Sequence, residues 1–222
     1  MDPNYSLIGY ALLWLVAAFF AGSIPWGYLI VRICFHDDIR KHGSGNIGFT
    51  NVYRMYGWTA GLSCFLLDIA KGLVPVVLAA RNFGFPANAP GGSQQAAVLI
   101  AVGVVAILGH VFTPWLRFKG GKGIATGLGV LIALYGWMIL VPLAVFIAVM
   151  LPTRYVSLGS LCAAVVVAVL PFFAFATGLK YYWLLGILTL LLVLFTHREN
   201  IKRLATGKES RFEWKRGKKN AA

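Results

Sequence analysis

Six long apolar runs, separated by short polar segments, make up most of the chain. They cover residues 7–31, 59–80, 95–112, 124–151, 158–176 and 182–196. A run of about twenty apolar residues is long enough to cross a hydrocarbon core of roughly 30 Å as a helix. A soluble helix would instead alternate between an apolar and a polar face. The pattern therefore predicts an all-α integral membrane protein.

The fourth run, 124–151, is too long for one ordinary span. It contains Tyr135-Gly136-Trp137 and Pro142, residue types that interrupt helices or form turns. We therefore divide this run into two short helices joined by a tight turn, which gives seven spans in total. A single long, tilted helix is the alternative interpretation.

Lysine and arginine are distributed unevenly among the polar segments. Seventeen of the twenty lie in residues 32–58, 113–123, 152–157 and the stretch after 196. Basic residues mark cytoplasmic loops, so seven spans with an outer N-terminus place all four segments in the cytoplasm. Six spans would place the basic tail outside and are rejected. The first six residues lack Lys and Arg, so run 7–31 is interpreted as a retained span and not as a signal peptide.

The composition agrees with a membrane protein. Of the 222 residues, 59% are apolar and 12% are charged, whereas a soluble domain has about a quarter of its residues charged. Residues 1–210 are predicted to form one membrane domain, and 211–222 a basic cytoplasmic tail that is frayed. The three cysteines lack the spacing of a metal site, so we expect no metal.

The first polar segment, 43–51, is rich in Gly, Ser and Asn. It matches the GxGxxG pattern, but no strand precedes it, so a dinucleotide-binding turn is rejected. Its flexible backbone and the side chains of Ser44, Asn46, Asn51 and Arg54 offer hydrogen-bond donors to an anion. A solvated loop that merely interrupts the helices is the alternative.

The second polar segment is Lys119-Gly120-Gly121-Lys122-Gly123. It lacks the first Gly and the Ser or Thr of a Walker A loop. Glycines that open a helix beside two lysines nevertheless suit a phosphate, because free N–H groups and the positive end of the helix dipole coincide there. Lysines that contact anionic lipid at the membrane surface are the alternative.

The third and fourth polar segments add Arg154 and Ser157 before one run, and His197 and Asn200 after the last run. His197 and Asn200 are three residues apart and share a helix face, although His197 also suits an interfacial cap. The runs that follow the first three segments all start on the same side. Their positive ends, with the cations Arg54, Lys119, Lys122 and Arg154, are expected to form one pocket for a ligand with several phosphate-like charges.

Two charged residues, Asp68 and Lys71, lie inside the second run, three residues apart. An unpaired charge at this depth costs on the order of 3 kcal/mol. We therefore expect the two side chains to form an ion pair inside the bundle, with a structural rather than a catalytic role. His110, near the inner end of the third run, is left without an assigned role.

These segments together resemble the PlsY family of bacterial membrane acyltransferases. The resemblance rests on Gly22-Ser23-Ile24-Pro25 and on residues 43–54, 68–72, 109–127, 154–160 and 197–209, in the order and spacing of that family. It implies transfer of a fatty acyl group from acyl-phosphate to the 1-hydroxyl of glycerol 3-phosphate. The products are phosphate and lysophosphatidic acid, in the first acylation of phospholipid synthesis.

The resemblance also implies roles for particular residues. Ser44, Arg54, His197 and Asn200 are expected to be catalytic, and Glu209 to be structural. The residues expected to bind substrate or phosphate are Asn46, Asn51, Lys119, Gly120, Gly121, Lys122, Gly123, Arg154 and Ser157. Phe49 departs from the family pattern, in which a small Ala is expected, and is predicted to pack beside the first loop.

The resemblance further implies no metal, no cofactor and no need for acyl-CoA. We expect glycerol 3-phosphate, acyl-phosphate and membrane lipid as partners, together with an enzyme that forms acyl-phosphate, and no nucleic acid. The location implied is the bacterial inner membrane, with the active site facing the cytoplasm.

The expected mechanism is direct transfer without a covalent enzyme intermediate, in which His197 or the substrate's own phosphate accepts the proton. No His is followed by the His-x4-Asp pattern of acyl-CoA-dependent glycerolipid acyltransferases. A transporter of small organic anions is the alternative function, because Asp68 and Lys71 lie within a span. Motifs confined to one side and the lack of an internal repeat argue against it. A lipid-binding scaffold leaves His197 and Asn200 unexplained.

Overall fold

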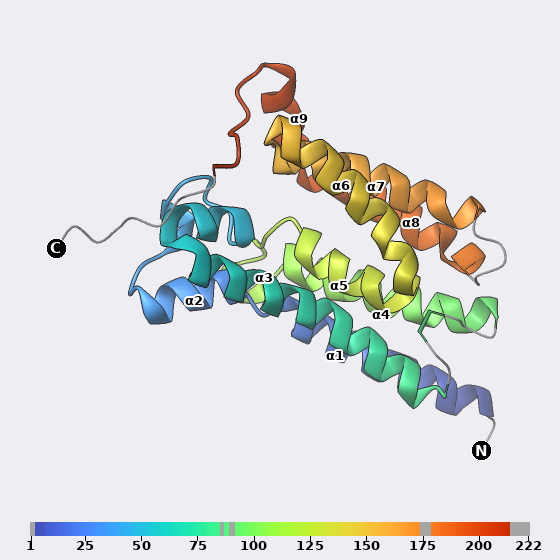
Figure 1. Cartoon of the computed structure of the whole chain (residues 1–222). Coiled ribbons are helices and arrows are strands. Elements are labelled where there is room, and N and C mark those ends of the chain that lie inside the picture. The colour runs from blue at the N-terminus through green and yellow to red at the C-terminus, as the bar shows by residue number, and fades with distance from the viewer. Residues whose placement is uncertain (1–2, 85–86, 89–91, 174–178, 214–222) are drawn as a thin grey trace.

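The computed structural model describes residues 3–84, 87–88, 92–173 and 179–213, and all regular structure within these ranges is helical. The helices pack in two groups, seen in Figure 1. The first group contains α1 (Pro3–Ser23), α2 (Trp26–Cys34), α3 (Phe49–Asn82), α4 (Ser93–Val111) and α5 (Ile124–Tyr135). The second contains α6 (Leu140–Thr153), α7 (Val156–Phe173), α8 (Trp183–Thr196) and α9 (Arg198–Ala205). Contacts between α4 and α8 join the two groups.

The helices have the length and composition of membrane spans, which confirms the predicted all-α class. Four helical segments within the described residues could each cross a membrane: Phe49–Asn82, Ser93–Leu116, Ile124–Thr153 and Val156–Phe173. The number rises to six if each of two bent helix pairs forms one span. The predicted count of seven spans and the predicted orientation are not established by these lengths and stay predictions.

The first apolar run, interpreted above as one retained span, forms a bent pair of helices. Helices α1 and α2 meet at an angle of 41°, with Ile24 and Pro25 between them. Proline has no N–H to donate, and its ring clashes with the preceding turn of a helix, so the chain bends there. The carbonyl of Ile24 accepts a hydrogen bond from Lys71 Nζ at 2.7 Å, which supplies a partner at the break.

Helix α3 begins at Phe49, ten residues before the predicted start of the second span. Its first two turns are separated from the rest by Gly57, whose φ of 86° and ψ of −175° are not helical. A residue with a Cβ rarely adopts such angles, and glycine adopts them without steric cost. The segment 49–56, predicted to be loop, is therefore a short helix set at a kink before the long apolar part.

The predicted break in the fourth apolar run is confirmed. Helix α5 ends at Tyr135 and the 3-10 turn η3 (Gly136–Ile139) leads into α6, with Gly136 at a φ of 52°. On either side of the turn, α5 packs against α3 and α6 packs against α7. The two helices therefore belong to different groups, although Ile124–Thr153 is also long and apolar enough to count as one candidate span.

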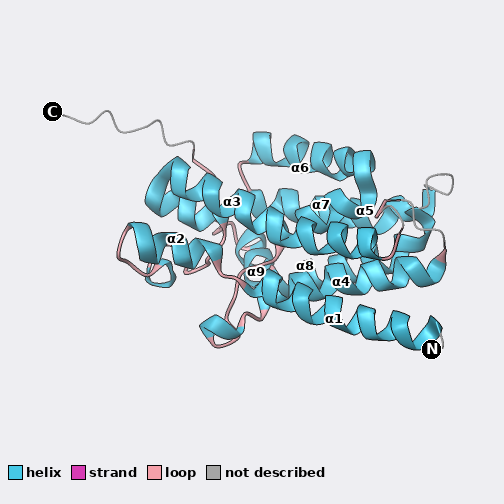
Figure 2. Cartoon of the chain, turned by 90° about the horizontal axis from the view of Figure 1, so that it is seen from below, coloured by secondary structure: helices cyan, strands magenta, loops and turns pink. Residues whose placement is uncertain are grey.

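The four polar segments lie at one end of the bundle. Figures 1 and 2 show the loop before α3, the segment between α4 and α5, the turn before α7, and α9 at the same end, opposite the N-terminus. Glycines allow α3 and α5 to approach each other closely. A Cβ on Gly72 of α3 or on Gly129 of α5 would overlap a backbone carbonyl of the other helix. Small residues allow such close approach of helices in membranes.

Candidate active site

The glycine turn at 120–123 folds back over the end of α4. The N–H of Gly120 donates to Val111 O at 3.0 Å, and the N–H of Gly121 donates to His110 O at 3.2 Å. These bonds satisfy carbonyls that the end of a helix leaves without partners. Of the N–H groups expected to be free for a phosphate, those of Gly120 and Gly121 are therefore already bonded to α4. Gly120 is required by close packing instead, because a Cβ there would overlap the carbonyl of His110.

Lys122 points from this turn toward α9. Its ammonium donates to Asn200 Oδ1 at 2.5 Å, and Thr196 Oγ1 donates to its carbonyl at 3.3 Å. Burial lowers the pKa of Lys122 to about 8, against the attraction of Glu209. Lys122 is therefore mainly charged at neutral pH, and two of its three ammonium donors have no partner among the described residues. Gly123, with a φ of 80°, then starts α5.

Asn200 links Lys122 to Glu209 through hydrogen bonds. The Nδ2 of Asn200 donates to Glu209 Oε1 at 2.6 Å, and Ser157 Oγ donates to the same oxygen at 2.8 Å. Arg203 Nε donates to Oε2 at 2.7 Å. Burial alone would raise the pKa of Glu209, but the hydrogen bonds from Asn200, Ser157 and Arg203 outweigh it and hold that pKa below its usual value. Glu209 is thus an ionised carboxylate that joins α7, α9 and the tail.

His197 lies at the junction of α8 and α9 and is 2% exposed. Its Nδ1 lies 3.0 Å from Val193 O, and since a carbonyl only accepts, Nδ1 carries the proton and Nε2 a lone pair. Burial, with the charge of Lys122, lowers the pKa of His197 to about 4. The imidazole is therefore neutral at neutral pH. Asn200 is also buried, whereas Arg198 and Glu199 are exposed, so the predicted shared face is confirmed.

The first loop is organised by Asn51, which is 2% exposed. Its Nδ2 donates to His42 O at 3.0 Å and to Asn46 O at 2.9 Å, and its Oδ1 accepts from Ser44 N–H at 3.0 Å. Both amide hydrogens are therefore used within the loop, and Asn51 supports the loop rather than presenting donors to a ligand. Asn46 Oδ1 accepts from Gly48 N–H at 2.8 Å, and Ser44 is exposed.

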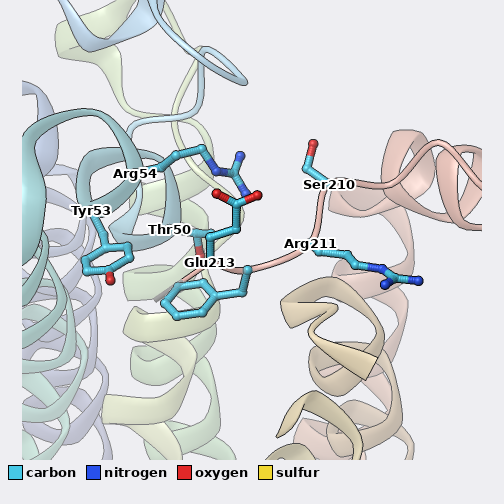
Figure 3. A pocket seen from close by; sticks show the side chains of 7 residues that line it. Thr50, Tyr53, Arg54, Ser210, Arg211 and Glu213 are labelled. Carbon is cyan, nitrogen blue, oxygen red and sulfur yellow. The ribbon is translucent and has the colours of Figure 1, made fainter. Parts of the chain in front are cut away.

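Arg54 lines a separate cavity of about 360 Å³, shown in Figure 3. Its lining residues come from the first two turns of α3 and from the tail: Thr50, Tyr53, Arg54, Ser210, Arg211, Phe212 and Glu213. The carboxylate of Glu213 points toward Arg54, whereas Arg211 points away and donates to Tyr155 Oη at 3.4 Å. The cavity therefore combines the cation of Arg54 and the carboxylate of Glu213 with hydroxyl groups beside the first loop.

The tail is ordered beyond the predicted boundary at 210. The ring of Phe212 is buried and stacks on Tyr53 with centroids 5.1 Å apart, and Phe49 lies on the same cluster at 6.4 Å. The N–H of Phe212 donates to Arg154 O at 2.6 Å. Phe212, within the segment predicted to be frayed, is thus packed against α3 and bonded to the turn before α7. Residues 214–222 lie outside the described ranges.

The four cations expected to share one pocket are spread over the end of the bundle opposite the N-terminus. Lys122 belongs to the network with Asn200, and Arg54 lines the cavity beside the tail. Lys119 is exposed and lines another cavity, of about 480 Å³, with Arg40 and Trp115. Arg154 is exposed, with a φ of 60°, and its carbonyl holds Phe212. The starts of α3, α5 and α7 lie at the same end of the bundle. The four cations nevertheless reach different neighbours, although Lys119 and Lys122 come from the same segment.

The predicted ion pair between Asp68 and Lys71 is confirmed, with Nζ 2.8 Å from Oδ1 and both side chains buried. His110 Nδ1 lies 3.8 Å from the same carboxylate oxygen. The sequence did not predict Thr196 and Arg203 of the Lys122 network, nor Phe212 and the other residues that line the cavity with Arg54. Only Phe212 carries a signal in the sequence, as an aromatic residue within a charged tail. Among the described residues, no group of three or more His, Cys, Asp or Glu could hold a metal ion.

Comparison with known proteins identifies the chain's relatives. The family model described as glycerol-3-phosphate acyltransferase matches residues 12–207. Proteins of that name from Geobacter sulfurreducens and Geotalea daltonii are 45% and 42% identical, over 88% and 90% of this chain and 94% and 96% of theirs.

Two crystal structures of PlsY, an integral membrane glycerol 3-phosphate acyltransferase, have a similar fold. The glycerol 3-phosphate form gives a TM-score of 0.81 at 36% identity, over 91% of this chain and 96% of that one. The lysophosphatidic acid form gives 0.78 at 35% identity, over 91% and 95%. With a family match over most of its length, this chain belongs to the PlsY family of glycerol-3-phosphate acyltransferases and is a membrane acyltransferase of phospholipid synthesis.

Proposed function

We propose that this acyltransferase takes its acyl group from acyl-phosphate and passes it directly to the 1-hydroxyl of glycerol 3-phosphate. The observation that carries the proposal is the network of Lys122, Asn200 and Glu209 beside a neutral His197. It combines a cation for the acceptor's phosphate with a nitrogen lone pair for the acceptor's proton. Neither a scaffold nor a transporter of organic anions needs this pairing.

Glycerol 3-phosphate is proposed to bind at Lys122. One ammonium donor is bound to Asn200, and the other two are available to phosphate oxygens in a charge-assisted contact. The start of α5 adds the positive end of a helix dipole. Gly120 and Gly121 then act by holding the turn against α4, and Gly123 by starting α5. Ser157 acts through Glu209, which keeps Asn200 and so Lys122 in place.

Acyl-phosphate is proposed to bind at the first loop and Arg54. It is already an activated mixed anhydride, and its leaving phosphate needs charge neutralisation more than protonation. Arg54 supplies a planar guanidinium cation that suits phosphate oxygens, and the Ser44 hydroxyl and Asn46 lie on the loop that Asn51 holds. The fatty acyl chain extends into the membrane among the apolar helices. Lys119 and Arg154 are proposed to attract the anionic substrates from the surface.

In the proposed step, the 1-hydroxyl oxygen bonds to the acyl carbon as the bond from that carbon to the phosphate oxygen breaks. Inorganic phosphate leaves with the electron pair, and the hydroxyl proton goes to His197 Nε2 or to the substrate's own phosphate. The low pKa of His197 makes it a weak base in the free enzyme. A bound dianionic phosphate nearby would raise that pKa and favour proton transfer.

The proposed setting is a bacterial inner membrane with seven spans, the N-terminus outside and the site facing the cytoplasm. The bent pair α1–α2 and helices α3 to α8 supply the spans, and residues 1–213 form one domain. Labelling of single cysteines in a background without Cys34, Cys64 and Cys162 tests this. Gly92→Cys should react from outside and Lys119→Cys from inside, and reaction of both from one face would contradict the arrangement.

The proposal is tested with purified protein in detergent micelles, given acyl-phosphate and labelled glycerol 3-phosphate. Labelled lysophosphatidic acid and one equivalent of phosphate are expected for each turnover. Robust turnover with acyl-CoA and none with acyl-phosphate would overturn the proposed donor. Uptake of glycerol 3-phosphate into protein-containing vesicles without any acyl transfer would favour the transporter. Because the donor is a reactive anhydride, we also propose that a separate enzyme of the same cell supplies it.

A further inference from the structure

A buried histidine separates the glycine turn from the membrane-embedded ion pair. His110 lies in the last turn of α4 and is 3% exposed. On one side its Nδ1 is 3.8 Å from Asp68 Oδ1. On the other side its ring fills the space beneath Gly121, since a Cβ added to that glycine would overlap His110 Nε2. The imidazole therefore spans the gap between Asp68 and the turn that carries Lys122.

Asp68, on the side of His110 away from the glycine turn, is held by several contacts. Asp68 is bound by Lys71 at 2.8 Å, and Lys71 donates in turn to Ile24 O at 2.7 Å. The opposite oxygen of Asp68 accepts a 3.6 Å contact from Cys64 Sγ, which also lies 3.7 Å from Ile47 O of the first loop. Charges buried in a membrane are costly to separate. The ion pair therefore keeps a fixed position below His110 and the glycine turn.

We propose that His110 is a positioning residue for glycerol 3-phosphate: its ring sets the height of Gly121 over the ion pair and thereby directs Lys122 toward Asn200 and the substrate. This inference rests on the proposed binding of the substrate phosphate at Lys122. His110 itself touches neither substrate. Gly121 must be glycine because the ring occupies the place where a Cβ would go, not because a phosphate does.

The test is a double-mutant cycle on Gly121 and His110, with kcat and KM measured for both substrates. Gly121→Ala should raise KM for glycerol 3-phosphate tenfold or more, because the methyl group pushes the turn off the ring. Adding His110→Ala makes room for that methyl group. The double variant should therefore bind the substrate better than Gly121→Ala alone, with a coupling of about two- to a hundredfold, the range for residues in contact.

Gly120→Ala is the matched control. A Cβ at Gly120 would overlap the backbone carbonyl of His110, not its ring, so His110→Ala should give no rescue in that background. Rescue of both glycine variants alike, or simple additivity in the Gly121 cycle, would overturn the proposal. If the role of His110 is purely structural, its replacement should lower the folded fraction and kcat without a selective change in KM for either substrate.

A milder variant covers the case in which Gly121→Ala does not fold. His110→Asn shortens the spacer and keeps a polar group, so KM for glycerol 3-phosphate should rise while KM for acyl-phosphate stays within about twofold. An unchanged KM for glycerol 3-phosphate would overturn the inference. Lys122→Ala separates the two levels of the argument. If it leaves that KM unchanged, the proposed phosphate site fails, whereas a raised KM without coupling between Gly121 and His110 rejects only the spacer.

Discussion

The first loop is held by hydrogen bonds between residues close together in the sequence, whereas the network around Lys122 is held by hydrogen bonds between residues far apart in the sequence. Asn51 bonds to His42, Ser44 and Asn46, all within nine residues of itself. Lys122 and Asn200 are 78 residues apart, and Ser157 and Glu209 are 52 apart. The loop therefore takes its shape locally, whereas the network exists only when α5, α7 and α9 have packed together. The two substrates are proposed to divide between these regions in the same way.

The difference teaches what each region contributes. A locally built loop keeps its form when distant helices shift, which suits a leaving phosphate that needs only fixed donors. A network assembled from distant segments shifts with any change in helix packing. The positions of its acid–base groups therefore depend on the packing of several helices. Changes in one region should therefore leave the substrate of the other region nearly unaffected.

The largest effect is expected on the network side, from His197→Ala. If His197 Nε2 accepts the hydroxyl proton, kcat should fall by about 10²–10⁴-fold with folded protein retained. Arg198→Ala, at the exposed neighbouring position, is the control and should keep nearly full activity. A loss of less than about tenfold in His197→Ala would assign the proton to the substrate phosphate, since general-base catalysis is worth more than that.

Lys122→Ala should mainly raise KM for glycerol 3-phosphate. It removes a charge-assisted contact worth roughly 1.5–3 kcal/mol, which corresponds to about ten- to more than a hundredfold. Lys119→Ala serves as the matched control, because that lysine is exposed in another cavity and has no bond to Asn200 in the described network. Equal increases in KM from both variants would mean that the two lysines act only by attracting anions.

Asn51→Ala tests the loop. It removes the hydrogen-bond partners of His42 O, Asn46 O and Ser44 N–H. Leaving such a group unsatisfied costs about 1–3 kcal/mol when it is buried. KM for acyl-phosphate should rise, whereas KM for glycerol 3-phosphate should stay within about twofold. Initial rates with each substrate varied in turn provide the measurement. A parallel rise in both constants would contradict the division of the site into two regions.

A dependence on pH is also expected, and it is the smallest of these effects near neutral pH. The pKa of Lys122 lies at about 8, so the free enzyme loses this charge as the pH rises through that value. KM for glycerol 3-phosphate should be flat between about pH 7 and 8 and then rise roughly tenfold per pH unit. KM for acyl-phosphate, which we assign to Arg54, should not follow it. A flat profile for glycerol 3-phosphate up to pH 10 would remove Lys122 from the site.

The same division decides what the sequence could predict. The apolar runs place the helices, and Gly136 predicts the break before α6, because both signals are local. The ion pair between Asp68 and Lys71 follows from their spacing on one helix. His197 and Asn200 share their buried face for the same reason. Each of these features needs only neighbouring residues.

Features that depend on packing were missed or misassigned. The glycines of the turn suggest free N–H groups, and only the fold of the turn over α4 shows that Gly120 and Gly121 donate to its carbonyls. Pro25 is visible in the sequence, but the carbonyl of Ile24 at the break is bound by Lys71, which lies 47 residues after Ile24. Arg203 is one of nine basic residues after residue 196, and nothing local marks it as the partner of Glu209. The contact of Phe212 with Tyr53 likewise joins remote segments.

The hydrogen bond from Lys71 to Ile24 has a consequence for how the chain enters a membrane. Both partners of Lys71 described above, Asp68 and the carbonyl of Ile24, precede it in the sequence. As synthesis proceeds from the N-terminus, they have already been made when Lys71 emerges. The first two apolar segments can therefore neutralise their own buried charge as a hairpin, before α4 and His110 exist. Insertion of this hairpin does not have to wait for the rest of the bundle.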